Sequence, residues 1–123
     1  MNYDLAIIGG GAAGMAAAVF AAENGVRTVV IEHNRQLGKK LAITGKGRCN
    51  VTNNSDNDNI MKNIPTGSRF LYSALAGFSA YDTMNFFEGL GVPLKTERGN
   101  RVFPVSDSAK DIVEACLLYT SPS

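Results

Sequence analysis

Short apolar runs and an alanine-rich stretch at the start of the chain predict a strand, a helix and a second strand. Leu5–Ile8 is a run of the length and composition of a buried strand, and Thr28–Ile31 is a second one rich in β-branched residues. Between them, the alanine-rich stretch that ends at Asn24 favours a helix, and Gly25 favours its termination. This order predicts one βαβ unit with two parallel strands.

After Glu32 the pattern changes to a basic connection with several glycines, His33 to Asn54, which has no sustained periodicity. We expect a long structured loop there, with a short helix near Leu37 to Ala42. The polar run Asn53 to Asn59 is expected to be an excursion at the surface.

Helical periodicity returns in the second half of the chain. It predicts two amphipathic helices, about Ser68 to Ala76 and Tyr81 to Leu90. The second should begin at Ser79, with Asp82 completing a capping box, and end at Gly91. The apolar side chains expected in the core are Phe70, Leu71, Leu75, Phe78, Phe86, Phe87 and Leu90.

A β-hairpin and a last helix are predicted toward the end of the chain. Leu94 to Glu97 and Arg101 to Phe103 suit two short strands, and Gly99 and Asn100 between them tolerate the positive φ angles of a tight turn. A helix should follow from Ser108 into Leu117.

Composition and charge exclude some classes of function. Hydrophobic residues make up 45% of the 123 residues and charged residues 19%, as in an ordinary globular domain. Because 12 lysines and arginines balance 11 acids, nothing points to nucleic acid or to a membrane surface as a partner, and a small-molecule substrate is expected.

No targeting segment or apolar stretch of membrane-spanning length is visible, so we expect a cytoplasmic protein with reduced cysteines. The spacing of Cys49 and Cys116 is not that of a metal site or a redox motif. No metal site is therefore expected, and no catalytic residue is assigned.

Three glycines between the first strand and the helix form a G-x-G-x-x-G motif. Gly9 permits the sharp turn, Gly11 lets backbone N–H groups reach a pyrophosphate, and Gly14 lets the helix pack closely on the strands. Glu32 lies 18 residues beyond Gly14, where a carboxylate can accept hydrogen bonds from both ribose hydroxyls. An acid at this position favours FAD or NAD over NADP. A turn that binds no nucleotide is the alternative.

A second constellation, Thr44 to Asn53, combines two glycines, two cations and several amide or hydroxyl side chains. Such a loop can bring backbone donors and positive charge to a planar, electron-accepting ligand. A reduced flavin carries negative charge near N1, which nearby cations or N–H groups would stabilise. The alternative is a solvated basic turn.

With Gly38–Lys40 before this loop and Gly99–Asp107 after it, the chain resembles the bacterial BaiN/RdsA-like NAD(P)/FAD-dependent oxidoreductases, also labelled aminoacetone-oxidase-like flavoproteins. The resemblance extends from about Asn2 to Cys116. The signature G-x-G-R-C-N-x-T-N falls on Gly45 to Asn53, and the stretch [GN]-R-V-F-P-x-S falls on Asn100 to Ser106.

This resemblance implies FAD as the cofactor, bound as in fumarate-reductase-like and glutathione-reductase-like flavoproteins, and NAD(P)H as the co-substrate of the complete enzyme. Two alternatives are a NAD-binding module of a dehydrogenase or sensor, and a nucleotide-binding protein without catalysis. The residues expected to bind the cofactor are Gly9, Gly11, Ala12, Ala13, Gly14, Glu32, His33, Lys39, Lys40, Thr44, Gly45, Lys46, Gly47, Arg48, Cys49 and Asn50.

The expected fold class is α/β: a Rossmann-like FAD-binding βαβ unit followed by helices and a β-hairpin, in an incomplete doubly wound domain. Residues 1–116 would be the N-terminal part of an FAD-binding domain, with 33–54 as the flavin-side loop and 55–116 as the helices and hairpin. Since further parallel strands are needed to complete such a domain, we expect the chain by itself to be an inactive fragment. Residues 117–123 are expected to be foreign sequence, with a natural chain terminus as the alternative.

Three residues of the expected site allow different roles. Arg48 either contacts FAD or a substrate carboxylate, or pins the loop through a carboxylate such as Glu32. Cys49, beside an arginine, could have a lowered pKa, but a buried structural thiol is the more common role, so we assign it no catalysis. His33 is expected beside the adenosine and not at the flavin ring.

Overall fold

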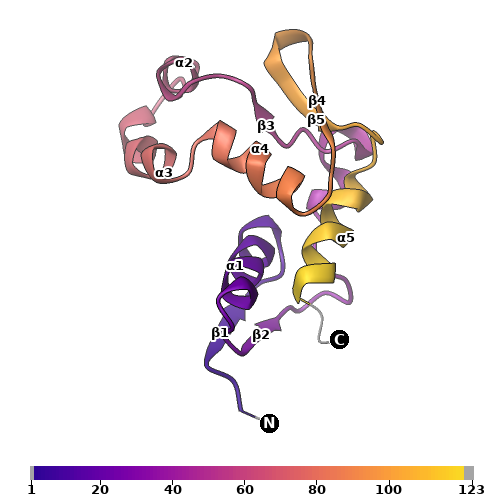
Figure 1. Cartoon of the computed structure of the whole chain (residues 1–123). Coiled ribbons are helices and arrows are strands. Elements are labelled where there is room, and N and C mark those ends of the chain that lie inside the picture. Colours follow the sequence, from indigo (N-terminus) through magenta and orange to yellow (C-terminus); the bar gives the residue numbers. More distant parts are fainter. Residues whose placement is uncertain (1, 121–123) are drawn as a thin grey trace.

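The start of the chain folds into the predicted strand, helix and strand at one end of the molecule (Figure 1). The computed structural model describes residues 2–120. Strand β1 (Leu5–Ile8) pairs in parallel with β2 (Thr28–Ile31), and helix α1 (Ala12–Glu23) connects the two and contacts both. Parallel neighbours need such a crossover, so the predicted βαβ unit is confirmed.

Close packing at Gly14 sets the position of α1 against the strands. A Cβ atom at this residue would lie 1.9 Å from the carbonyl oxygen of Gly9 and 3.4 Å from the side chain of Ile7. Only glycine allows this approach, as predicted from the motif. Farther along the helix, Ala18 and Val19 are buried.

The basic connection after β2 contains a short helix, but later than predicted. We expected it near Leu37 to Ala42, whereas the structure has a 3-10 helix, η1 (Leu41–Gly47). Gly38 has φ +68°, and a Cβ there would lie 2.9 Å from Met15 and 3.0 Å from Val113. The chain turns at this left-handed residue, and η1 begins after it. The 3-10 helix is itself interrupted, because Thr44 is extended and Gly45 and Lys46 have φ angles of +55° and +57°.

The polar run Asn53 to Asn59 reaches the surface only in part, since Ser55 within it is buried, and it is more ordered than predicted. It includes the end of a short strand, β3 (Thr52–Asn53), and the start of a helix, α2 (Asn57–Lys62). Asp56 caps α2 by accepting a hydrogen bond of 2.8 Å from the backbone N–H of Asn59. The helix was missed because its signal is this polar cap and not an apolar period.

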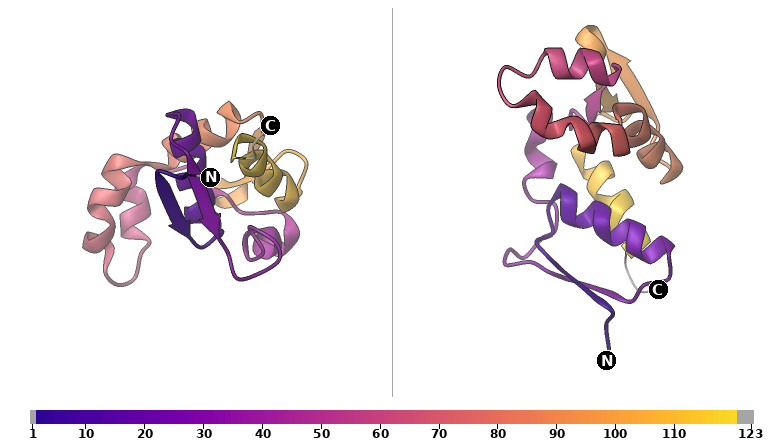
Figure 2. Two further views of the ribbon diagram at one scale, coloured as in Figure 1. Left: turned by 90° about the horizontal axis from the view of Figure 1, so that it is seen from below. Right: turned by 90° about the vertical axis from the view of Figure 1, so that its left-hand side faces the viewer.

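The first predicted amphipathic helix, Ser68 to Ala76, is split into η2 (Ser68–Leu71) and α3 (Tyr72–Gly77). Together with α2, these elements form a lobe that projects away from the βαβ unit (Figures 1 and 2). They contact mainly one another, so their outer face has few neighbours. Phe70 is 89% exposed and Leu71 is 38% exposed, and our assignment of both to the core was wrong.

The second predicted helix is confirmed as α4 (Ala80–Gly89), including its capping box. The hydroxyl of Ser79 accepts a hydrogen bond from the backbone N–H of Asp82, and the Asp82 carboxylate accepts one of 2.8 Å from the backbone N–H of Ser79. Gly91, with φ +90°, follows the end of the helix as predicted.

Side chains of α4 reach the core only in part. Phe86, Phe87 and Leu90 are half-buried and pack against the buried clusters. Leu75 is also half-buried, but Phe78 is 41% exposed and was wrongly assigned to the core. The core itself lies mainly between α1, η1 and the last helix, as the contacts between these elements show.

The predicted hairpin is confirmed as β4 (Leu94–Glu97) and β5 (Arg101–Pro104). A short 3-10 turn, η3 (Arg98–Asn100), joins the strands, with φ +75° at Gly99 and +60° at Asn100. Strand β3 pairs with β5 on the other side, which makes a three-stranded antiparallel sheet in the order β3-β5-β4. The sequence did not predict this third strand.

The last helix, α5 (Ala109–Thr120), begins near the predicted position and continues beyond Leu117. It packs against α1 and η1, and Ile112 and Val113 are buried in this contact. Of the segment 117–123, which we expected to be foreign sequence, residues 117–120 belong to α5, and 121–123 lie outside the described residues. Among residues 2–120, no helix is both long and apolar enough to span a membrane.

The close approach at Gly38 yields a stability prediction. Gly38→Ala should lower the free energy of unfolding through the left-handed φ and through overpacking against Met15 and Val113. Gly67→Ala is the matched control, because Gly67 has φ +79° but open space around it. In urea unfolding, Gly38→Ala should cost roughly 1–3 kcal/mol more than the control. Equal losses would show that packing at Gly38 is not tight.

Candidate cofactor site

The N-terminus of α1 is left without a side-chain cap. Its N-cap residue is Gly11, in an extended conformation, and the first turn contains no acidic residue. Ala12 and Ala13 are exposed, and a Cβ on Gly11 would meet no atom within 4 Å. The N–H groups that a helix leaves unpaired at its start therefore face open space, which is the arrangement that binds an anionic group such as a phosphate.

Glu32, at the end of β2, is held beside this helix start by two backbone donors. Its carboxylate accepts hydrogen bonds of 2.8 Å from the N–H of Gly10 and 2.8 Å from the N–H of Asn34. These hydrogen bonds, that from Gly10 first, lower the pKa of Glu32, so it is ionised at neutral pH. Each carboxylate oxygen keeps further acceptor capacity for a ligand hydroxyl.

A cleft of about 440 Å³, called here the polar cleft because most of the residues that line it are polar or charged, lies beside Glu32. Two lysines on its rim supply positive charge, and His33, whose side chain is 90% exposed, lies with Nδ1 3.4 Å from the Glu32 carboxylate. The structure thus brings five predicted site residues together at one cleft. Its lining is Gly10, Gly11, Glu32, His33, Asn34, Gln36, Lys39, Lys40 and Ile43.

A second hollow, of about 320 Å³, is mainly apolar and lies between α1, η1, α4 and α5. The predicted residues at this cavity are Ala12, Ala13, Thr44, Cys49 and Asn50, and an aromatic wall of Phe20, Phe78, Phe86 and Phe87 faces them. The polar cleft and the apolar cavity thus meet at the start of α1, where Gly11 lines the cleft and Ala12 lines the cavity. They meet again in η1, where Ile43 lines the cleft and Thr44 lines the cavity.

The loop Gly45–Asn50, called here the signature loop, folds back on itself. The backbone N–H of Cys49 donates to the carbonyl of Thr44 at 3.0 Å, and that of Arg48 donates to Gly45 at 3.1 Å. A Cβ on Gly45 would lie 2.8 Å from the backbone nitrogen of Asn50, so glycine is required there. Lys46 and Gly47 are exposed at the tip.

Arg48 points toward the hairpin and forms ion pairs with Glu97, at the end of β4, and with Asp107, which follows β5. Its Nη2 lies 2.5 Å from Glu97 and 2.7 Å from Asp107, and its guanidinium carbon lies 3.9 Å from the centre of the Phe103 ring. The structure thus shows the loop-pinning alternative, with these two carboxylates in place of Glu32. Asn50 also turns toward β5, because its amide donates to the carbonyl of Val102 at 3.2 Å.

Cys49 is a buried thiol with an exposed fraction of 2%. Burial raises the pKa of this thiol, against a smaller lowering by a hydrogen bond with Thr44. A lowered pKa through the neighbouring Arg48 is thus contradicted, and the structural role that we preferred fits this environment. Cys116 lines the same apolar cavity, and burial raises its pKa to about 11.

Comparison with known proteins identifies the family. Residues 3–121 match the family model described as HI0933-like protein Rossmann domain. The chain belongs to this family. That assignment confirms the resemblance drawn from the sequence, and the family's Rossmann domain is consistent with the observed βαβ unit.

Two relatives and one solved structure show what this family member is similar to. It is 35% identical over 112 residues to the 3-dehydro-bile acid delta(4,6)-reductase of Clostridium scindens, covering 89% of this chain and 27% of the relative. It is 32% identical over 113 residues to the ribosomal RNA dihydrouridine synthase of Escherichia coli, covering 92% of this chain and 28% of that relative. The chain thus spans about a quarter of the length of these relatives.

The solved structure is Thermovibrio ammonificans THI4, with a TM-score of 0.54 at 15% identity, over 96% of this chain and 36% of that one. This likeness shows the fold alone. Since one of the relatives is named as a reductase, oxidoreductases are among the proteins similar to this chain.

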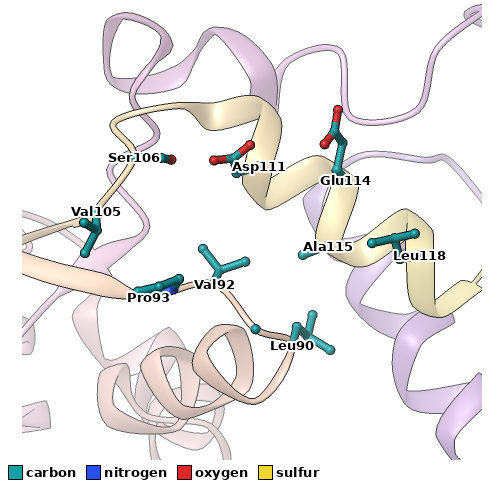
Figure 3. A pocket seen from close by; sticks show the side chains of 10 residues that line it. Leu90, Val92, Pro93, Val105, Ser106, Asp111, Glu114, Ala115 and Leu118 are labelled. Atoms are coloured by element: carbon teal, nitrogen blue, oxygen red, sulfur yellow. The ribbon is translucent and has the colours of Figure 1, made fainter.

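A third hollow, of about 410 Å³, lies on another side of α5 (Figure 3). Asp111 and Glu114 on α5 lie at its upper side, across from Val92 and Pro93. None of the residues predicted to bind the cofactor lines it.

The structure adds site residues that sequence reasoning missed. Gly10 donates to Glu32, and a Cβ on it would lie 2.1 Å from the end of the Leu37 side chain, which would have to move to make room. Asn34 was missed because it acts through its backbone N–H, for which sequence carries no signal. Within the part of the chain that the structure describes, no group of three His, Cys, Asp or Glu side chains could hold a metal ion.

The raised pKa of Cys116 predicts a loss of stability at high pH. A thiol with a pKa near 9 when unfolded and about 11 when folded contributes stability fully below pH 9, and this contribution is lost as pH rises toward 11. When urea unfolding is measured at pH 8 and at pH 10.5, the free energy of unfolding should decline less between these two pH values for Cys116→Ala than for the parent protein. The same decline in both proteins would place the thiol in a less buried environment.

Proposed function

We propose that this chain is the FAD-binding, N-terminal portion of a flavin-dependent oxidoreductase. The observation that carries the proposal is the ionised Glu32 carboxylate, held by two backbone N–H groups next to the uncapped start of α1. An acceptor for ribose hydroxyls and a donor set for a diphosphate are thus preformed side by side.

The residues present fit FAD on both sides of the α1 start. Glu32 would accept hydrogen bonds from the ribose, the N–H groups of Ala12 and Ala13 would donate to the diphosphate, and Lys39 and Lys40 would balance its charge. The apolar cavity on the other side of the same turn offers a water-poor wall suited to a flat ring system. When bound, FAD would supply two-electron transfer.

Lys46 is the cation of the signature loop that we assign to the flavin side. Arg48 is already engaged by two carboxylates, whereas Lys46 is exposed and has no ion pair among the described residues. A lysine here can lie near the negative charge that a reduced flavin develops.

On the basis of the sequence, we extend the proposal to NAD(P)H as the reductant, to a small-molecule substrate and to a cytoplasmic location. The named substrates of the relatives differ in kind, since one is a bile acid and another a ribosomal RNA. For this reason no substrate is transferred from them to this chain.

Purification of the full-length protein tests the proposal most simply. We expect a yellow protein whose absorbance shows the flavin bands and whose released cofactor is FAD. A colourless protein that binds NADH and takes up no added FAD would instead support the dehydrogenase or sensor alternative.

Glu32→Gln should weaken FAD binding, because it removes the charge and one of the two acceptor oxygens that Gly10 and Asn34 hold. Charge-assisted hydrogen bonds of this kind contribute about 1–3 kcal/mol, or roughly 5- to 150-fold in Kd. Titration of the apo-protein measures the effect. Glu88→Gln, an exposed change on α4, is the control and should leave the Kd unchanged. An unchanged Kd for Glu32→Gln would remove Glu32 from the site.

Gly11→Val separates binding from folding. Gly11 has φ −83°, which any residue adopts, and its Cβ direction is open, so the protein should fold with an unchanged Tm. The valine side chain would, however, fill the space we assign to the diphosphate, and FAD affinity should fall by about tenfold or more. Gly14→Ala should instead unfold the protein, because its Cβ would meet the Gly9 carbonyl at 1.9 Å. Normal FAD binding by Gly11→Val would place the diphosphate elsewhere.

A further inference from the structure

Four charged side chains join the signature loop to the hairpin, and we call them the Arg48 cluster: Arg48, Lys95, Glu97 and Asp107. Lys95 Nζ lies 2.9 Å from Asp107 and 3.2 Å from Glu97, and Arg48 contacts the same two carboxylates at 2.7 Å and 2.5 Å. Each carboxylate is therefore shared by two cations. Two positive and two negative charges cancel, so the cluster offers no free charge to a substrate.

The guanidinium of Arg48 is fixed in more ways than a typical surface arginine. Its Nε and Nη2 both donate to Asp107, at 2.9 Å and 2.7 Å, and Nη2 also contacts Glu97. One face covers Phe103, which is 3% exposed and belongs to β5. Single exposed ion pairs hold side chains weakly, but a planar group that is paired on its edge and stacked on its face has one preferred position.

The backbone on both sides of Arg48 needs such a restraint. Lys46 has φ +57° and Cys49 has φ +61°, and both are residues with side chains in the left-handed region. Asp107, on the other side of the cluster, has φ +58°. Strained conformations of this kind persist only where the surrounding contacts hold them, and they occur often in loops that bind ligands.

The hairpin residues of the cluster do not reach either hollow themselves. Lys95, Glu97 and Asp107 line neither the polar cleft nor the apolar cavity. The cavity is instead lined by Cys49 and Asn50, which directly follow Arg48 in the signature loop. Arg48 is the member of the cluster that belongs to the signature loop, so it connects Glu97 and Asp107 to the residues that line the cavity.

We propose that Glu97 and Asp107 are positioning residues which, through Arg48, hold the signature loop in the conformation that receives the flavin end of the cofactor. This inference rests on the proposed function. It gives the β4-β5 hairpin, which contributes no atom to the site, control over cofactor affinity. It also assigns Arg48 a role that excludes it from binding a substrate carboxylate.

The test uses the full-length protein and the double variant Glu97→Gln/Asp107→Asn, which keeps the shape of both side chains and removes their charge. We expect the Kd for FAD to rise about tenfold, through faster dissociation. Amide exchange at Arg48 and Cys49, which close the loop on Gly45 and Thr44, should quicken in the apo-protein. The control is Asp4→Asn, which breaks the exposed Asp4–Arg27 ion pair of 3.1 Å and should leave both readouts unchanged.

A thermodynamic cycle separates positioning from general destabilisation. Arg48→Gln alone should raise the Kd for FAD by a similar factor, and adding the two carboxylate changes to it should have no further effect, because they act only through Arg48. Additive effects, or an unchanged Kd in the carboxylate variant, would overturn the inference. If the parent protein binds no FAD, the proposed function is wrong. If the parent protein binds FAD and all variants bind it with the same affinity, only the positioning role is wrong.

Discussion

The contact between Gly14 and the carbonyl of Gly9 fixes how α1 lies against the two parallel strands. Because no side chain separates them, α1 lies directly on the parallel strands, and its uncapped start comes to rest beside the end of β2. Glu32 leaves β2 at that point and is fixed by the N–H of Gly10, inside the same glycine run. One close packing contact thus places both the uncapped N–H groups and the Glu32 carboxylate, to which we assign the diphosphate and the ribose.

The second half of the chain supports this site from the opposite side. Helix α5 packs on α1 and η1, and buries Ile112 and Val113 against them, so that η1 is held next to the start of α1. The hairpin then fixes the signature loop through Arg48 and Phe103. The βαβ unit supplies one part of the site, and the elements after it determine where the signature loop lies.

Local pattern was enough to predict the βαβ unit, the hairpin and the capping box of α4, because each depends on neighbours in sequence. The prediction failed where distant contacts decide. The left-handed turn at Gly38 packs against Met15 and Val113 from distant elements, and Phe70 is exposed because its lobe has little to pack on. The partners of Arg48 are 49 and 59 residues away along the chain, and no periodicity connects such positions. The expectation of FAD came from the family resemblance together with Glu32.

Hydrogen exchange of the full-length protein with and without FAD shows where on the chain the cofactor binds. We expect FAD to slow exchange of the backbone amides in Gly10–Gly14 and around Glu32 to Lys40, since the diphosphate and ribose would lie against them. The signature loop should be protected as well. Protection confined to other parts of the protein, with exchange at the start of α1 unchanged, would contradict the claim that this glycine turn and Glu32 hold the cofactor.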